Sequence, residues 1–134
     1  MRCPRCHAEM RTVEPVSMAL VTVNIAPCIA CGGRWFPSGE LAKIEDVVDL
    51  RFVELRHIPV DAVQRVPLTC PQCPGTPPLE KVENAREKNV VMDACRHCNG
   101  IWLDRGELEA IQQESLPVAI LNLFRWLREN RGSY

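Results

Sequence analysis

The residues of this sequence best suited to chemistry are its eight cysteines, because every one belongs to a C-x-x-C pair. The four pairs are Cys3/Cys6, Cys28/Cys31, Cys70/Cys73 and Cys95/Cys98. Two such pairs brought together place four thiolates at the corners of a tetrahedron, which is the closed geometry of a structural zinc site. We therefore predict two zinc sites, one from the first two pairs and one from the last two. No ligand position is left for a water molecule, so we predict no catalytic residues and no enzyme.

Disulfide bonds are the main alternative use of an even number of cysteines, but they need an oxidising compartment. The sequence begins with MRCPRC, without a charged and then apolar leader, so we expect no secretory signal. It contains no apolar run of roughly 18 residues or more, so we expect no membrane span. A cytoplasmic protein with paired C-x-x-C motifs is better interpreted as metal-binding. Iron in a rubredoxin-like site uses similar cysteine turns, and it stays open as the less favoured metal.

An internal repeat organises the chain. A shift of 67 positions superposes the two halves without gaps and aligns all eight cysteines. The same shift aligns CGGRWFPSGEL (31–41) with CNGIWLDRGEL (98–108). A module of roughly 40 residues buries too little surface to fold alone, whereas a structural zinc supplies roughly 10–16 kcal/mol. We therefore interpret the chain as two copies of one metal-stabilised module.

The segments between the cysteine pairs predict short antiparallel strands. VSMALVTVNIA (16–26) is rich in β-branched residues, and LEKV (79–82) and NVVMDA (89–94) flank a polar turn. Each module is expected to be a hairpin or a three-stranded ribbon, followed by a helix. The predicted fold class is a small metal-stabilised α+β fold of two tandem four-cysteine zinc ribbons, each followed by a helix, plus a C-terminal amphipathic helix.

Helix signals follow the second cysteine pair of each half. Leu41, Ile44 and Val48 lie on one helical face in the first half, and Ser38 is expected to cap that helix. In the second half the spacing of Asp104 and Glu107 predicts a weak capping box. The predicted domain organisation is a first ribbon and helix (1–57), a linker (58–69), a second ribbon and short helix (70–114), and the C-terminal helix (115–130).

Six residues beside the second cysteine pairs are predicted to support the fold: Gly33, Trp35, Gly100, Trp102, Asp104 and Glu107. The matched tryptophans are expected to pack a helix onto each ribbon rather than to stack on nucleic-acid bases. The glycines just after the second cysteine pairs, Gly32, Gly33 and Gly100, fit a turn, since a positive φ costs glycine little. The two carboxylates are expected to start a helix rather than to act in catalysis. His7 and His97 neighbour ligands, but each four-cysteine set is complete, so both are expected at the surface.

The segment LPVAILNLFRWLREN predicts an amphipathic C-terminal helix. The candidate partner-binding residues on its apolar stripe are Leu116, Ile120, Leu123, Phe124 and Leu127. A protein partner or self-association through this stripe is therefore expected. The formal net charge is −1, which does not favour nucleic acid. Six arginines nevertheless make the ribbons locally basic and keep phosphate contacts open as an alternative: Arg2, Arg5, Arg11, Arg34, Arg96 and Arg105.

Each half resembles the bacterial zinc-ribbon family named for its similarity to the zinc ribbon of transcription factor IIB. The family pattern is a C-P-x-C turn, a spacer, and then C-x-x-C-G-G-x-W-L-D-x-G-E-L. The second half, with CPQC and CRHCNGIWLDRGEL, matches nearly throughout, and Asn99 replaces the first glycine. The first half, with CPRC and CIACGGRWFPSGEL, has Phe36, Pro37 and Ser38 where Leu-Asp-x is usual. The resemblance implies a structural zinc ion in each half, and this departure changes no ligand.

The function expected from these observations is a cytoplasmic, non-enzymatic zinc protein that acts as a macromolecular interaction module. Contact with transcription machinery or nucleic acid is one version, and a protein adaptor is the other. Two alternatives belong to other classes. The first is electron transfer by iron in the same cysteine sites. The second is a zinc-dependent chaperone, because CIACGG is similar to the C-x-x-C-x-G repeats of one chaperone co-factor family.

Overall fold

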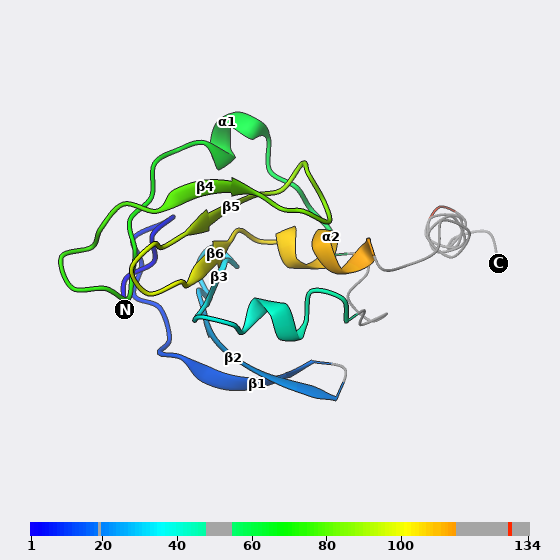
Figure 1. Cartoon of the computed structure of the whole chain (residues 1–134), viewed down its shortest axis with the longest axis horizontal. Helices are drawn as coiled ribbons and strands as arrows, with labels where there is room; N and C mark the ends of the chain where they lie inside the picture. Colours follow the sequence, from blue (N-terminus) through cyan, green and yellow to red (C-terminus); the bar gives the residue numbers. More distant parts are fainter. Residues whose placement is uncertain (19, 48–54, 115–128, 130–134) are drawn as a thin grey trace.

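The two halves of the chain contribute three strands each to one antiparallel sheet (Figure 1). The structure is a computed structural model and describes residues 1–18, 20–47, 55–114 and 129. The strands of the first half are β1 (Glu14–Met18), β2 (Val21–Pro27) and β3 (Arg34–Phe36). Those of the second half are β4 (Glu80–Glu83), β5 (Val91–Ala94) and β6 (Ile101–Leu103). Each half is therefore a three-stranded ribbon, which is one of the two alternatives predicted from the sequence.

The sheet joins the two ribbons at its centre, with the strand order β1-β2-β3-β6-β5-β4. Strands β3 and β6 pair antiparallel, and Trp35 lies directly opposite Trp102. The flanking pairs join Arg34 to Leu103 and Phe36 to Ile101. Trp35 and Trp102 are equivalent residues of the repeat, and the two flanking pairs are exchanged when the halves are exchanged, so β3 and β6 are related by an approximate local two-fold axis between the tryptophans. The sequence predicted two ribbons in tandem, and it did not predict that they share a sheet.

The hairpin of the first half illustrates why these residues form strands. Along β2, Val23 and Ile25 are buried while Thr22 and Asn24 are exposed, which is the alternation of a strand with one covered face. Leu20, at φ +72°, reverses the chain between β1 and β2. The two strands in the stretch that the sequence marked as rich in β-branched residues therefore pair as a hairpin.

The described helical segments are short, and the two halves differ in them. The 3₁₀ turn η1 (Leu41–Lys43) follows the first ribbon, and the α-helix α2 (Glu107–Gln113) follows the second. The predicted first helix is therefore reduced to three residues within the described part of the chain, and no side chain caps it. Its apolar face is nevertheless in the core, because Leu41 and Ile44 are buried. Val48 and the predicted C-terminal helix, apart from residue 129, lie outside the described residues.

The segment predicted as a linker contains a further helix, α1 (Asp61–Gln64). Gln64 is 2% exposed and fastens α1 to the second ribbon. Its amide group donates to the carbonyl oxygens of Pro59 (2.8 Å) and Asn89 (3.0 Å) and accepts the N–H of Val91 (2.6 Å). The Gln64 side chain therefore hydrogen-bonds both to Pro59, just before α1, and to Asn89 and Val91 of the second ribbon. These bonds hold α1 against the sheet.

Two apolar cores stabilise the molecule. The first, here called the cysteine core, contains Met10, Trp35, Leu68 and Trp102 together with the buried cysteines of both halves. The second, here called the helix core, lies under α2 and includes Val23, Phe36, Leu103 and Ile111. In Figure 1, α2 lies toward the end of the molecule away from the N-terminus. None of the described helices has the length and apolar character needed to cross a membrane.

Candidate metal centres

Each metal centre begins with a backbone turn that the C-x-x-C spacing makes. In the first half, the N–H of Cys6 donates to Cys3 Sγ at 3.4 Å, and the N–H of Gly32 donates to the carbonyl of Cys28 at 2.8 Å. The second half repeats both contacts, with Cys73 to Cys70 Sγ at 3.3 Å and Asn99 to the Cys95 carbonyl at 2.9 Å. The backbone turns themselves therefore orient the thiol groups.

The glycine and the asparagine that close these turns share one backbone conformation. Gly32 has φ +80°, and Asn99, its counterpart in the repeat, has φ +60°. Asparagine is one of the few other residues that tolerate this left-handed region. The replacement of the family's first glycine by Asn99 therefore preserves the turn.

The sulfur atoms of each half lie within 4.8 Å of one another, in the two sets predicted from the sequence. Two of these separations are 3.7 Å (Cys3–Cys31) and 3.6 Å (Cys6–Cys28) in the first half. The corresponding separations are 3.8 Å for both Cys70–Cys98 and Cys73–Cys95 in the second half. A regular tetrahedron with metal–sulfur bonds of about 2.3 Å has edges of about 3.8 Å. Both clusters therefore fit one tetrahedrally coordinated metal ion each.

Protonation of the thiols shows why these clusters need a cation. Burial raises the pKa of Cys3 to about 11 and that of Cys70 to about 12. Burial also opposes ionisation of Cys95, but hydrogen bonds from the backbone N–H groups of Cys98 and His97 outweigh it and lower its pKa to about 7. Only the thiolate binds a metal, so a metal ion must displace protons from the buried thiols.

The two tryptophans bind the halves together, and not a helix to its own ribbon as the sequence suggested. A Cβ atom built on Gly33 would lie 2.1 Å from Cζ2 of Trp102, and one built on Gly100 would lie 2.1 Å from Cζ2 of Trp35. Each indole ring thus lies against the glycine of the opposite half. Neither glycine is needed for a positive φ. Both are needed because no side chain fits between backbone and ring, so the predicted turn role of Gly33 and Gly100 is wrong.

The indole N–H groups find different acceptors in the two halves. Trp102 Nε1 donates to Asp104 Oδ1 at 3.0 Å, and Arg5 of the opposite half binds that carboxylate through Nε (2.9 Å) and Nη2 (2.7 Å). Trp35 Nε1 instead donates to Gln72 Oε1 of the opposite half at 2.9 Å. The repeat aligns Gln72 with Arg5 and Pro37 with Asp104. Where Pro37 supplies no acceptor, glutamine takes the place of arginine and accepts the indole N–H directly.

Asp104 and Glu107, the two carboxylates predicted to form a capping box, have different roles. Glu107 Oε1 accepts the backbone N–H of Asp104 at 2.5 Å, which is one of the two contacts of a capping box, but the N-cap of α2 is Gly106 and not Asp104. The Asp104 side chain caps nothing and is half of the Arg5 ion pair, so that part of the prediction is wrong. Glu107 is 1% exposed. Burial and the neighbouring charge of Asp104 raise the pKa of Glu107 to about 8.

The arginines that kept phosphate binding open are mostly engaged with acidic side chains. Besides the Arg5 pair, Arg34 Nη2 lies 2.9 Å from Glu109 Oε1, and Arg96 Nη2 lies 2.5 Å from Glu80 Oε1. Arg11 is 3.4 Å from Glu14 in an exposed pair. His7 and His97 are exposed, as expected. The candidate partner-binding stripe at Leu116–Leu127 lies outside the described residues.

Several contacts between the halves were missed by the sequence analysis, notably those of Arg5, Gln72 and Glu109. One signal was available for the first two. Aligning the repeat shows that the halves differ jointly at Arg5/Gln72 and at Pro37/Asp104. Joint differences at two positions indicate a contact, but only once the halves are known to face each other. No comparable signal marks the Arg34–Glu109 pair.

A comparison with protein-family models gives an independent result. The model described as transcription factor zinc-finger, of the zinc-ribbon type of transcription factor IIB, matches residues 2–47 and residues 69–114. The matched ranges cover more than half of the chain, and each contains one four-cysteine cluster. No curated protein and no solved structure matches the chain.

Proposed function

The chain belongs to the transcription factor zinc-finger family, in two tandem copies, and from this premise we propose that it is a non-enzymatic zinc protein that binds a macromolecular partner. The two metal ions are structural in this proposal. They fasten the ends of both ribbons into the cysteine core, and the joined ribbons act as one rigid unit. The partner is a protein, and a transcription-related role is one setting in which such a module works.

Zinc is the metal that the proposal assigns to both centres. Its support is the family, together with sulfur spacings that fit a four-thiolate tetrahedron. Purified protein should contain two zinc ions per chain by mass spectrometry of the metals and should be colourless. Red protein loaded with iron would replace this proposal by electron transfer in the same sites.

The observation that carries the proposal is that many charged and reactive side chains of the described residues are engaged with one another. All eight cysteine sulfurs belong to the metal clusters. The carboxylates of Asp104, Glu109 and Asp93 pair with Arg5, Arg34 and Lys81, respectively. These groups stabilise the molecule and are not arranged as a nucleophile with its base.

The same ion pairs support a protein rather than a nucleic acid as the partner. Binding to nucleic acid needs arginines and lysines that are free to neutralise phosphates and so to release the counterions of the nucleic acid. Here several arginines already neutralise carboxylates, and the net charge is −1. Large apolar side chains are exposed instead, among them Leu20, Ile29, Val60, Val63 and Val66. Val60, Val63 and Val66 lie in and beside α1. An exposed apolar surface of this kind favours contact with a protein.

The test is capture of partners on the immobilised full chain, from lysate treated with nuclease and from untreated lysate. We expect the same proteins in both samples. Loss of all partners after nuclease treatment would show that nucleic acid carries the association. A parallel chain with Leu123→Ser and Phe124→Ser tests whether the C-terminal stripe contributes, and the stripe is excluded if oligomeric state and partners stay the same.

A further inference from the structure

A surface cavity of about 390 Å³, here called the arginine cavity, lies where the segment before α1 meets the start of α2. Its described walls are Leu55, Arg56, His57 and Arg105. Two of these side chains are guanidinium cations, one is an imidazole, and none is acidic. The volume lies within the range for small-ligand pockets, roughly 300–1,000 Å³. The composition of the described walls therefore points to an anionic ligand.

Two glycines allow the walls of the arginine cavity to approach one another. A Cβ atom built on Gly106 would lie 2.5 Å from Cβ of His57 and 2.6 Å from its backbone nitrogen. The N–H of His57 donates to the carbonyl oxygen of Gly106 at 3.2 Å. A Cβ atom on Gly32 would lie 2.9 Å from Cδ of Arg105, so the stem of Arg105 lies along a turn of the first metal centre. The repeat aligns Gly106 with Gly39, where a built Cβ meets no atom within 4 Å, so this close approach occurs in one half alone.

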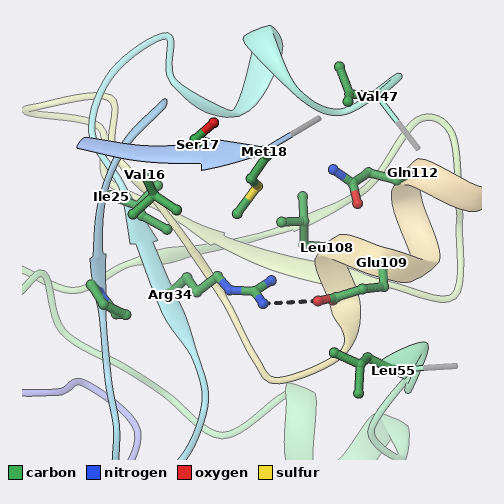
Figure 2. A pocket seen from close by; sticks show the side chains of 11 residues that line it. Val16, Ser17, Met18, Ile25, Arg34, Val47, Leu55, Leu108, Glu109 and Gln112 are labelled. Atoms are coloured by element: carbon green, nitrogen blue, oxygen red, sulfur yellow. Dashed lines mark hydrogen bonds and ion pairs between the residues drawn. The ribbon is translucent and has the colours of Figure 1, made fainter. Parts of the chain in front are cut away.

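Arg105 is the cation of this cavity that lacks a partner. It is exposed, and it forms no hydrogen bond or ion pair with any other residue that the structure describes. Arg34 in the neighbouring cavity differs, because its guanidinium meets the carboxylate of Glu109 at 2.9 Å (Figure 2). Arg56 likewise places Nη2 3.0 Å from Glu87 Oε2. A guanidinium presents its N–H donors in a planar fork that matches the two oxygens of a carboxylate.

We propose that the arginine cavity binds a glutamate or aspartate side chain of the partner protein, whose carboxylate accepts hydrogen bonds from the guanidinium of Arg105. The inference rests on the proposed function and names one surface through which the protein partner binds. Nucleic acid presents a row of phosphates and needs several free cations along its path. One free arginine in a concave wall, with Arg56 already paired to Glu87, suits a single carboxylate instead.

The probe is a tetraglutamate peptide with blocked ends, and its control is the tetraglutamine peptide of the same length. Both are titrated into the zinc-loaded full chain at low ionic strength, while the amide signals of His57, Arg105 and Gly106 are followed by nuclear magnetic resonance. We expect saturable shifts with tetraglutamate and about tenfold weaker binding of tetraglutamine, because charge-assisted hydrogen bonds are lost. Equal binding of the two peptides, or no saturation with tetraglutamate, overturns the proposal.

The variant Arg105→Gln removes the free guanidinium and should weaken tetraglutamate binding about tenfold. Arg2→Gln is the matched control, because Arg2 is exposed, does not line the cavity and carries the same charge. The control should leave the dissociation constant unchanged within about twofold. If Arg105→Gln weakens binding no more than Arg2→Gln does, the assignment of Arg105 is overturned. The comparison of the two peptides on the unmodified chain remains decisive if Arg105→Gln fails to fold.

Two other occupants of the cavity are outcomes of the same titration. If single-stranded octathymidylate binds more tightly than tetraglutamate and loses this affinity in Arg105→Gln, the cavity takes phosphates of nucleic acid and the assignment to a protein is overturned. Asp49 and Glu54 precede Leu55 in the sequence and lie outside the described residues. If Asp49→Asn combined with Glu54→Gln tightens tetraglutamate binding at least tenfold, a carboxylate of the chain itself is the occupant, which also overturns the proposal.

Capture of proteins on the immobilised full chain separates this inference from the proposed function. Arg105→Gln should reduce the amount of captured partner at least tenfold, whereas Arg2→Gln should not. Capture by Arg105→Gln at the original level would overturn the arginine cavity as the binding surface while the proposed function stands. Absence of any captured protein with the original chain would reject the proposed function itself.

Discussion

Trp102 of the second half lies so close to Gly33 of the first that a Cβ atom on Gly33 would be 2.1 Å from its ring. The same relationship joins Trp35 and Gly100, so each half provides both the ring and the glycine. Trp35 and Trp102 are fully buried and face one another in the central strand pair. The glycine and the tryptophan that both halves share near their second cysteine pair are therefore the residues that join the ribbons.

Gly33→Ala is expected to destabilise the protein by about 3 kcal/mol or more, because the buried ring of Trp102 has no free space into which to move. Unfolding in urea measures the loss. Gly39→Ala is the matched control. Gly39 has φ +80° and no atoms within 4 Å of a built Cβ, so only the backbone cost of roughly 1–2 kcal/mol applies. Similar losses in the two variants would contradict the role of the ring. Trp102→Leu should recover part of the loss in the Gly33→Ala background.

Arg5 and Asp104 form the second link between the halves, and both side chains are largely buried, at 16% and 9% exposed. Asp104→Ala leaves a buried guanidinium without its partner and the indole N–H of Trp102 without its acceptor. The expected loss is roughly 3–5 kcal/mol, measured by urea unfolding. Glu80→Ala, which breaks the exposed pair with Arg96, should cost less than about 1 kcal/mol.

A double variant that makes the halves more alike tests the same link by introducing a second copy of it. Pro37→Asp together with Gln72→Arg would reproduce the Arg5–Asp104 arrangement beside Trp35. Each single change should destabilise the protein, and the pair should recover most of the loss. Additive losses would show that the two positions do not communicate.

The sequence was sufficient for the metal centres because four-cysteine sites depend on spacing, and the strands follow from patterns within a single half. The arrangement of the halves depends on contacts such as Trp102 with Gly33, which no local pattern contains. Glycine after a cysteine pair suits a turn equally well, so its type alone did not reveal the close approach. Similarly, Asp104 has the spacing of a helix cap. Its side chain binds Arg5 because a residue 99 positions away lies beside it in the folded chain.

Glu107 should make stability fall as pH rises toward 8. Its pKa is about 8 in the folded protein and 4.5 in a model peptide, so the folded state holds a proton that the unfolded chain releases. Stability from this group is complete below pH 4.5 and declines, by up to about 1.4 kcal/mol per pH unit, until the pH passes the folded pKa. Glu107→Gln keeps an acceptor for the Asp104 N–H and does not ionise. Its stability should therefore exceed that of the original chain at pH 8.

Urea unfolding between pH 6.5 and pH 8.5, with zinc in excess, measures this effect. The pKa of Asp93 is about 6, so most of its titration lies below the range. Glu80→Gln is the control, because hydrogen bonding to Arg96 lowers the pKa of Glu80 and places its titration well below the range. An identical slope for Glu107→Gln and the original chain would contradict protonation of Glu107.

The two metal centres are expected to depend on each other, because the buried cysteines of both halves belong to one core with Trp35 and Trp102. Cys95→Ser removes one ligand of the second centre and should reduce the metal content from two ions to one. The loss of a structural zinc withdraws roughly 10 kcal/mol from the second half. Its ribbon then holds Trp102 less firmly against Gly33, so a chelator should remove the remaining ion at least tenfold faster than it removes zinc from the original chain. His97→Ala, beside a ligand but exposed, should keep two ions and the original release rate. If the remaining ion in Cys95→Ser leaves at the original rate, the halves are independent metal modules that merely share a sheet.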